Sequence, residues 1–329
     1  MPFSRDSLDL DPADAAAAIQ SWIVTATARV LKRRGLVLGV SGGVDSAVCA
    51  ALAVRALGPD RVFALLMPEA DTDDDSTTRG RALCEELGID HVLEDIAPSL
   101  EGSGCYRRRD EAIRELFPDY GPGWRQKVTI AGDMLGSDRL SYFNLTVADP
   151  DGALATARMP APIYQRVIAA TNMKQRTRKM LEYFHAEARN AAVVGTPNRL
   201  EYELGFFVRG GDGLADLKPI AHLFKTQVYR LAEHLDVPVD IRSQPPTTDT
   251  YSLPQTQEEF YFALPYGEMD LLLYAWEHEV APEDAAGPMG LEVAQVERAY
   301  RDLEGKRRVA ARGLADACML EHVDLSERK

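Results

Sequence analysis

The sequence predicts an α/β fold in which helices cover both faces of a doubly wound, mostly parallel sheet. Two observations carry this prediction. Short β-rich apolar runs alternate with helical patterns along much of the chain. In addition, the first strand leads directly into a glycine-rich polar turn and a helix start, and ligands of such sheets bind at that end of the strands.

The predicted elements follow one another in a regular order. A first helix opens at Asp11-Pro12, where an N-cap residue and a first-turn proline coincide, and closes at three basic residues before Gly35. The alternation then predicts strand 36–40, helix 46–57, strand 61–67, helix 76–87 and strand 91–96. Later it predicts helix 165–188, strand 191–195, helix 223–235 and two helical stretches around 257–278 and 291–312.

Residues 98–164 interrupt this alternation. They are rich in Gly, Pro and charge, and contain one short helical stretch, RRRDEAIRELF. So long an irregular segment is usually a lid, a partner surface or a small subdomain, and the sequence leaves these open. We expect residues 1–329 to form a single domain, with 98–164 as an insertion or lid and 257–312 as a helical C-terminal part.

Composition excludes several classes of protein. The chain has 329 residues, 46% of them hydrophobic and 27% charged, as is usual for a globular protein. Its net charge of −14 argues against nucleic-acid partners, which need basic surfaces. No apolar stretch approaches the roughly 20 residues of a membrane helix, and the first ten residues lack a signal core, so we expect a cytoplasmic protein without a membrane partner. The four cysteines form no C-x-x-C pair, which argues against a zinc or redox site.

The most informative stretch is LVLGVSGGVDSAVCAAL, residues 36–52. A strand, two glycines and a helix start bring free backbone N–H groups and the positive end of a helix dipole together, which predicts a phosphate site. The stretch lacks the lysine of a P-loop and the G-x-G-x-x-G of a dinucleotide fold. The alternative is a tight turn with Asp45 or Ser46 as N-cap.

Two further stretches place polar residues near the predicted sheet edge. TNMKQRTRKM gathers four cations in an acidic chain, namely Lys174, Arg176, Arg178 and Lys179. The alternative for this stretch is a solvated helix face. VVGTPNRLE is a second strand–turn–helix junction, with Thr196 at the turn and Glu201 one helical turn later. A glutamate there is also compatible with a surface role beside the helix dipole.

A third stretch, FFVRGGDGLADLKPIAHLFKTQV, contains a glycine-dense loop and then a helix start. The loop carries Arg209, Asp212 and Asp216, and Lys225 begins the helix. A lysine at a helix start opposes the helix dipole, so we expect an anion near it.

The ordered set GVSGGVDS, NMKQRTRKM, GTPNRLE, GDGLADLKPI and KTQV resembles the ammonia-dependent NAD synthetase family, within the N-type ATP pyrophosphatases. The resemblance covers about residues 15–98 and 165–250, with weaker similarity to about 312. S-G-G-x-D-S alone marks only the superfamily, whereas the whole set is specific. It implies an adenine nucleotide alpha hydrolase-like fold and a ligase that forms a C–N bond.

The resemblance also implies site residues. ATP would be bound by Gly39, Val40, Ser41, Gly42, Gly43, Val44, Asp45, Ser46, Thr196, Lys225 and Thr247. The dinucleotide substrate, nicotinic acid adenine dinucleotide, would be bound by Arg176, Arg209, Asp216 and Lys306. Mg²⁺ would be held by Asp45 and Glu201. In the family reaction the substrate carboxylate attacks the ATP α-phosphorus, and ammonia converts the acyl-adenylate to NAD and AMP, so no catalytic nucleophile is expected.

Members of this family are homodimers with the substrate site at the interface. The chain leaves no room for a glutaminase-sized domain, so we expect free ammonia, or ammonia from a separate glutaminase, as the nitrogen source. Arg209 stands where the family usually has Lys, Gly305 stands where it has His, and PPTTDTYSLPQTQEEF replaces its P-T-A-D-L segment. These departures leave open two alternatives: an enzyme on the same ATP site that amidates another carboxylate or modifies tRNA, and a non-catalytic nucleotide-binding homologue.

Overall fold

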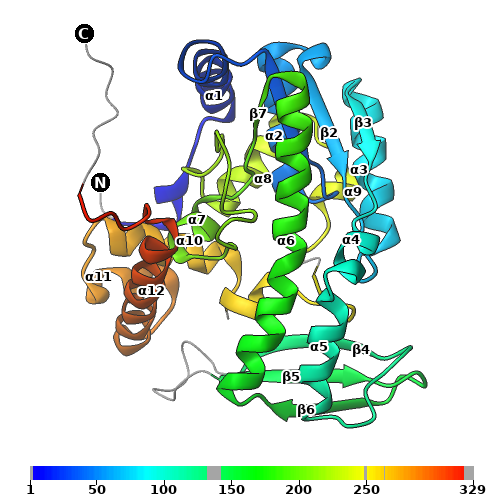
Figure 1. The fold of residues 1–329 in the computed structure, drawn as a ribbon. Helices are drawn as coiled ribbons and strands as arrows, with labels where there is room; N and C mark the ends of the chain where they lie inside the picture. Colours follow the sequence, from blue (N-terminus) through cyan, green and yellow to red (C-terminus); the bar gives the residue numbers. More distant parts are fainter. Residues whose placement is uncertain (1–2, 132–141, 248–249, 263, 322–329) are drawn as a thin grey trace.

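The computed structural model describes residues 3–131, 142–247, 250–262 and 264–321. Its centre is a four-stranded parallel sheet in the order β3-β2-β1-β7 (Figure 1). The strands are β1 (Gly35–Gly39), β2 (Val62–Leu66), β3 (Asp90–Leu93) and β7 (Ala191–Val193). Each lies within three residues of its predicted bounds at either end, and the predicted parallel α/β class is confirmed.

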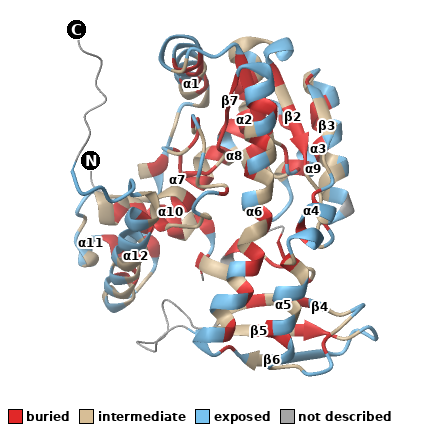
Figure 2. Cartoon of the chain, in the orientation of Figure 1, coloured by how far each residue is buried: buried red, intermediate tan, exposed pale blue. Residues whose placement is uncertain are grey.

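Helices pack on both faces of this sheet. One face contacts α1 (Pro12–Thr25), α2 (Val44–Leu57), α3 (Asp74–Leu87) and α8 (Lys225–His234). The other face contacts the long helix α6 (Ala161–Arg189). Side chains of β1 alternate accordingly: Leu36 and Leu38 are buried towards α1 and α2, and Val37 is buried in the cluster with α6. Figure 2 shows buried residues, in red, on the strands of the sheet and on the helices that cover it. Both faces are therefore apolar, as the continuous hydrophobic run predicted.

The described residues of the stretch 98–164 contain more regular structure than predicted. It contains α4 (Ala97–Gly102), α5 (Cys105–Arg114) and a three-stranded antiparallel sheet of β4 (Arg125–Ala131), β5 (Tyr142–Ala148) and β6 (Leu154–Arg158). These elements form a small subdomain around their own apolar cluster. These strands were not predicted because only one face of their sheet is buried and most of β6 is exposed, so their sequences lack a continuous apolar run.

Helix α6 connects the two sheets. It runs from the antiparallel sheet, where Ile163 and Val167 are buried, to the parallel sheet, where Ala186 is buried (Figure 1). With 29 residues and a rise of 1.5 Å per residue, this single helix is about 44 Å long. The insertion is thereby attached to the same helix that covers the parallel sheet.

The C-terminal part is helical, as predicted, and has its own apolar cluster. It comprises the π-helical segment η4 (Glu258–Phe262), α10 (Tyr266–Glu277), α11 (Pro282–Met289) and α12 (Val293–Leu314). Helix α11 was missed because its sequence, PEDAAGPM, contains Gly287 and Pro288, which usually mark loops. Five short elements complete the fold: η1 (Arg5–Leu8), η2 (Ala26–Val30), η3 (Pro59–Arg61), α7 (Arg199–Leu204) and α9 (Val239–Arg242).

Other expectations can be compared directly with the structure. Asp11 caps α1 by accepting the N–H groups of Ala13 and Asp14, with Pro12 in the first turn, as predicted. Cys49 and Cys84 are buried thiols, also as predicted. In the part of the chain that the structure describes, no helix is both long and apolar enough to cross a membrane.

Candidate functional site

The stretch Gly39–Ser46 forms a compact turn between β1 and α2. The N-cap of α2 is Gly43, so the alternative in which Asp45 or Ser46 caps this helix is wrong. The Ser46 hydroxyl instead donates to the Gly43 carbonyl at 2.9 Å and lies 3.2 Å from the Ser41 hydroxyl. Gly42 has φ +78°, and a Cβ there would collide with the Ser76 carbonyl oxygen. The turn therefore needs glycine, and its geometry suits an anion at the helix start.

A cavity of about 940 Å³ opens at this turn, at the carboxyl end of the parallel sheet. All residues predicted to bind ATP or metal line it, namely Gly39–Ser46, Thr196, Glu201, Lys225 and Thr247. These residues come from four separate stretches of sequence. Five aromatic residues also line the cavity. Two belong to the insertion, Trp124 and Tyr164, and three belong to the segment before α10, Tyr251, Phe260 and Tyr261.

Asp45 and Glu201 lie close together in this cavity. Asn198 connects them, because its Nδ2 donates to Asp45 Oδ1 at 3.3 Å while its backbone N–H donates to Glu201 Oε2 at 3.1 Å. Asn198 is also the N-cap of α7, so the strand–turn–helix junction forms as predicted. Burial, and secondly the charge of Asp45, raise the pKa of Glu201 to about 8. Glu201 itself is buried, so the alternative of a surface glutamate is wrong.

Lys225 is fully buried at the start of α8 and forms an ion pair with Asp45. Burial alone would lower the pKa of Lys225, but the carboxylates of Asp45 and Glu201 raise it. The anion expected at this helix start is present as well. Asp270 of α10, fully buried, accepts the backbone N–H groups of Lys225 at 3.2 Å and Thr226 at 2.7 Å. The carboxylate of Asp270 thus compensates the positive end of the helix dipole. Lys225 itself lines the cavity.

A divalent cation fits the chemistry of this cluster. Within the described residues, no group of three or more His, Cys, Asp or Glu side chains is placed to hold a metal ion. The carboxylates of Asp45 and Glu201, however, interact with each other and share one lysine, Lys225; burial first, and the charge of Asp45 second, raise the pKa of Glu201. Mg²⁺ is commonly held by one or two carboxylates together with substrate phosphates, which matches two protein ligands.

The basic stretch of α6 is only partly a solvated face. Lys174 and Lys179 are buried, while Arg176 is exposed. Lys179 forms an ion pair with Glu182 at 2.5 Å. Glu182 lines the cavity together with Asp212 of the glycine-dense loop, and burial raises the pKa of both carboxyls. The sequence did not predict Glu182 as a site residue. In the sequence, only Asp212 of the glycine-dense loop pointed to acidic residues in this part of the cavity.

The four predicted dinucleotide-binding residues do not line the cavity. Arg176 and Arg209 lie together, since the Arg176 Nε donates to the Arg209 carbonyl at 3.2 Å, and Arg209 reaches the carbonyl of Ala315 at 3.0 Å. Asp216 accepts the Val193 N–H at 2.8 Å. Lys306 is half-buried and donates to the carbonyl of Tyr261 at 3.0 Å.

Comparison with known proteins agrees with this geometry. A sequence model described as NAD synthase matches residues 17–114 and 139–310. An NH₃-dependent NAD⁺ synthetase of Rhizobium meliloti is 54% identical over 306 residues, which are 93% of this chain and 91% of that protein. Another, from Thermotoga neapolitana, is 39% identical over 254 residues, covering 76% and 81% of the two chains.

Solved structures share the fold. An NMN synthetase from Francisella tularensis superimposes with a TM-score of 0.64 at 23% identity, covering 95% of this chain and 100% of that one. An NH₃-dependent NAD synthetase from Campylobacter jejuni gives 0.59 at 21% identity, with the same coverage. The predicted family, fold class and reaction class of ligase are confirmed by these comparisons. The family model spans most of the sequence and includes the whole glycine-rich turn Gly39–Ser46, so the chain belongs to the NAD synthase family.

Proposed function

We propose that this chain is an ammonia-dependent NAD synthetase that uses ATP to activate the carboxylate of nicotinic acid adenine dinucleotide. The carboxylate oxygen attacks the α-phosphorus of ATP and pyrophosphate leaves. Ammonia then attacks the acyl-adenylate, which gives the amide and AMP. The observation that carries this proposal is the convergence of the Gly39–Ser46 turn, Glu201, Lys225 and Thr247 on one cavity at the sheet edge.

The chain's own groups support such a reaction without a side-chain nucleophile. The reaction needs alignment of two substrates and stabilisation of charge on phosphates. Backbone N–H groups at the start of α2 and the buried ammonium of Lys225 provide positive potential on the same cavity. No chemical role needs to be assigned to a cysteine, since Cys49, Cys84 and Cys105 are buried and burial raises the pKa of each.

We also propose that Asp45 and Glu201 hold Mg²⁺ when ATP is present. The ion would supply positive charge to the phosphates. Its binding requires Glu201 to be ionised, and an added cation beside Asp45 and Glu201 relieves the electrostatic cause of the raised pKa.

The dinucleotide site and the nitrogen source complete the proposal. Arg176 and Arg209 are exposed and lie outside the cavity, which supports a site completed by a second copy of the chain, as in a homodimer. Asp216 and Lys306 would belong to the same site. Residues 1–329 would act as one catalytic domain in the cytoplasm, supplied with free ammonia or with ammonia from a separate glutaminase.

The experiment is incubation of the purified chain with ATP, Mg²⁺, ammonium and nicotinic acid adenine dinucleotide. We expect NAD and AMP in equal amounts. With ¹⁸O in the substrate carboxylate, the label is expected in AMP and not in pyrophosphate, because that oxygen attacks the α-phosphorus. Formation of ADP would contradict the mechanism, and efficient use of glutamine by the chain alone would contradict the nitrogen source.

A further inference from the structure

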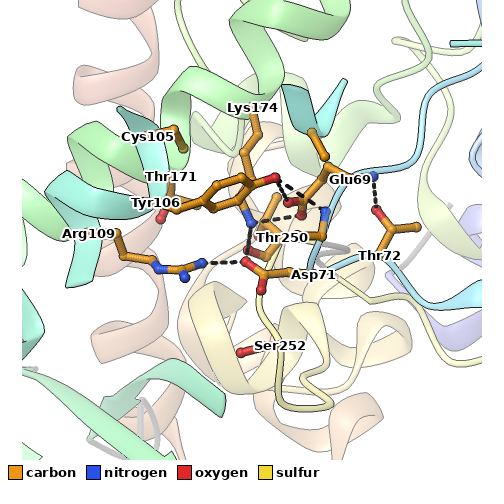
Figure 3. A network of polar contacts seen from close by, with 12 residues as sticks. Glu69, Asp71, Thr72, Cys105, Tyr106, Arg109, Thr171, Lys174, Thr250 and Ser252 are labelled. Carbon is orange, nitrogen blue, oxygen red and sulfur yellow. Dashed lines mark hydrogen bonds and ion pairs between the residues drawn. The ribbon is translucent and has the colours of Figure 1, made fainter. Parts of the chain in front are cut away.

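A buried network of charges lies beyond the carboxyl end of β2, beside the cavity (Figure 3). Its centre is Lys174 of α6, whose side chain is 0% exposed. The Lys174 ammonium donates to Glu69 Oε1 at 2.8 Å, to Asp71 Oδ2 at 2.6 Å and to the Thr250 carbonyl at 2.8 Å. Arg109 of the insertion helix α5 donates to the same oxygen of Asp71 at 2.5 Å. The network therefore joins α6, the loop after β2, the insertion and the loop at Thr250.

All the hydrogen-bonding capacity of Lys174 is used within the protein. An ammonium group has three N–H donors and no acceptor, and the three contacts account for all of them. Lys174 itself does not line the cavity, whereas two of its partners, Asp71 and Thr250, do. Lys174 can therefore influence a bound nucleotide only through these partners.

The network pairs buried cations with buried carboxylates. Lys174 and Arg109 face Glu69 and Asp71, and all four side chains are at least nine-tenths buried. Arg109 also forms an ion pair with the less buried Asp110 at 2.9 Å. Burial alone would raise the pKa of Asp71, but Lys174 and Arg109 lower it. Loss of Lys174 would leave a buried carboxylate without its cation, next to a cavity suited to anionic phosphates.

The insertion holds the loop at Thr250 from its other side. The backbone N–H of Gln126 in β4 donates to Ser252 Oγ at 2.8 Å, and the Leu253 N–H donates to the Gln126 carbonyl at 3.0 Å. Thr247, three positions before Thr250 in the sequence, also lines the cavity and is a predicted ATP contact. One wall of the cavity is thus attached both to β4 and to Lys174.

We propose that Lys174 is a positioning residue of the nucleotide site. Its ammonium fixes Asp71 and the Thr250 carbonyl relative to α6, and together with Arg109 of α5 and Gln126 of β4 it supports the two stretches that border the nucleotide, at Asp71 and at Thr250. The inference rests on the proposed function in one respect, that ATP binds in this cavity. It assigns a role to the insertion that the proposed reaction does not require.

The test compares Lys174→Met with Arg107→Met. Arg107 lies on α5, near Arg109, but pairs with Glu111 on the surface with 60% of its side chain exposed. The Kd for α,β-methylene-ATP is measured by calorimetry without dinucleotide or ammonium, because this analogue cannot release pyrophosphate. Since displaced loops align the nucleotide poorly, we expect Lys174→Met to raise that Kd about tenfold and Arg107→Met to leave it unchanged.

Steady-state kinetics separate positioning from general stability. We expect Lys174→Met to raise the KM for ATP by the same factor, with the KM for the dinucleotide and the kcat at saturating ATP within threefold of the wild type. Hydrogen exchange is expected to accelerate in residues 68–73 and 250–257 and to stay unchanged in β1 and α2. An unchanged Kd for the analogue, or a uniform acceleration of exchange, would overturn the inference.

A second variant covers the case in which Lys174→Met does not fold. Lys174→Met with Glu69→Gln removes one charge of each sign and leaves the Arg109–Asp71 pair balanced. We expect this protein to recover thermal stability but to keep the raised Kd, because the Thr250 carbonyl still lacks its donor. Recovery of both would show that Lys174 acts only on stability. A wild-type chain that binds the analogue but forms no NAD would refute the proposed function and leave this inference standing.

Discussion

Two fully buried lysines contact carboxylates at the carboxyl end of the parallel sheet, and their surroundings differ. Lys225 pairs with Asp45, which follows β1, and both residues line the cavity. Lys174 pairs with Glu69 and Asp71, which follow β2, and its third donor is bound to a carbonyl. Lys225 itself lines the cavity, whereas Lys174 does not, although its partners Asp71 and Thr250 do. Two lysines can therefore be equally buried and paired with carboxylates while only one of them is placed to contact a ligand in the cavity.

The largest expected effect tests the ligand-facing lysine. Lys225→Met should lower kcat about 1000-fold or more, because it removes a cation that stabilises charge on the phosphates in the transition state. Steady-state kinetics at saturating ATP measure this decrease in kcat, and circular dichroism confirms that the variant folds. If only the KM for ATP rose, Lys225 and Lys174 would act in the same way and the comparison would fail.

A third cation, Arg176, extends the comparison to the exposed surface. Removal of a charge contact that a substrate fully desolvates weakens binding by about 2–5 kcal/mol, roughly 30-fold or more. Arg176→Ala should therefore raise the KM for the dinucleotide by that factor and change the KM for ATP much less. Equal loss of affinity for both substrates, or no loss, would mean that Arg176 belongs to a solvated helix face.

Asp270 tests how the C-terminal helices support Lys225. Its carboxylate accepts two backbone N–H groups at the start of α8, and an asparagine would present an amide donor to one of them. We expect Asp270→Asn to lower kcat/KM for ATP about tenfold, since Lys225 shifts from its place. Glu268→Gln on the same helix is the control. Equal effects of the two substitutions would argue against a specific role of Asp270.

The smallest expected effect concerns pH and Mg²⁺. Glu201 has a folded-state pKa of about 8, above its ordinary value, so its stabilisation is complete below the unfolded pKa and is lost as pH rises through about 8. Mg²⁺ binds the ionised carboxylate and should offset this loss. The increase in Tm on adding Mg²⁺, measured by calorimetry from pH 6 to 9, should therefore grow with pH by about 2 °C or more.

Glu201→Gln is the control for that measurement, because it removes the titrating group. Its Tm should show no such growth with pH. A metal-dependent increase in Tm that persists in Glu201→Gln would place the ion elsewhere.

The glycine-rich turn Gly39–Ser46 could be predicted from sequence because its determinants are local. Gly42 is needed for a positive φ and a close approach of backbone, and a strand followed by a helix start leaves free N–H groups wherever it occurs. The same holds for the junction at Asn198, whose capping box with Glu201 spans four consecutive residues. Motifs of this kind can be recognised from a few consecutive residues, without knowledge of the tertiary structure.

The insertion and the buried network could not be predicted in this way. The strands of residues 98–164 bury one face only, so their apolar alternation is weak, and their pairing depends on α6 and the loop at Thr250. Lys174 appeared to be one of four cations on a solvated helix, and nothing within ten residues of it reveals that Glu69 and Asp71 lie opposite.

The sequence by itself determined the order of strands and helices around the parallel sheet, the glycine-rich turn Gly39–Ser46 and the family, because each depends on short motifs of residues close together in the chain. Only the tertiary structure decided which charges are buried and which of them face the cavity. Asp45 and Lys225 are 180 residues apart, and Lys174 and Glu69 are 105 apart. Contacts at such separations form only when the tertiary structure brings the strand ends together. Folding then removes these charges from water, and a buried charge is stable only with a partner of opposite sign.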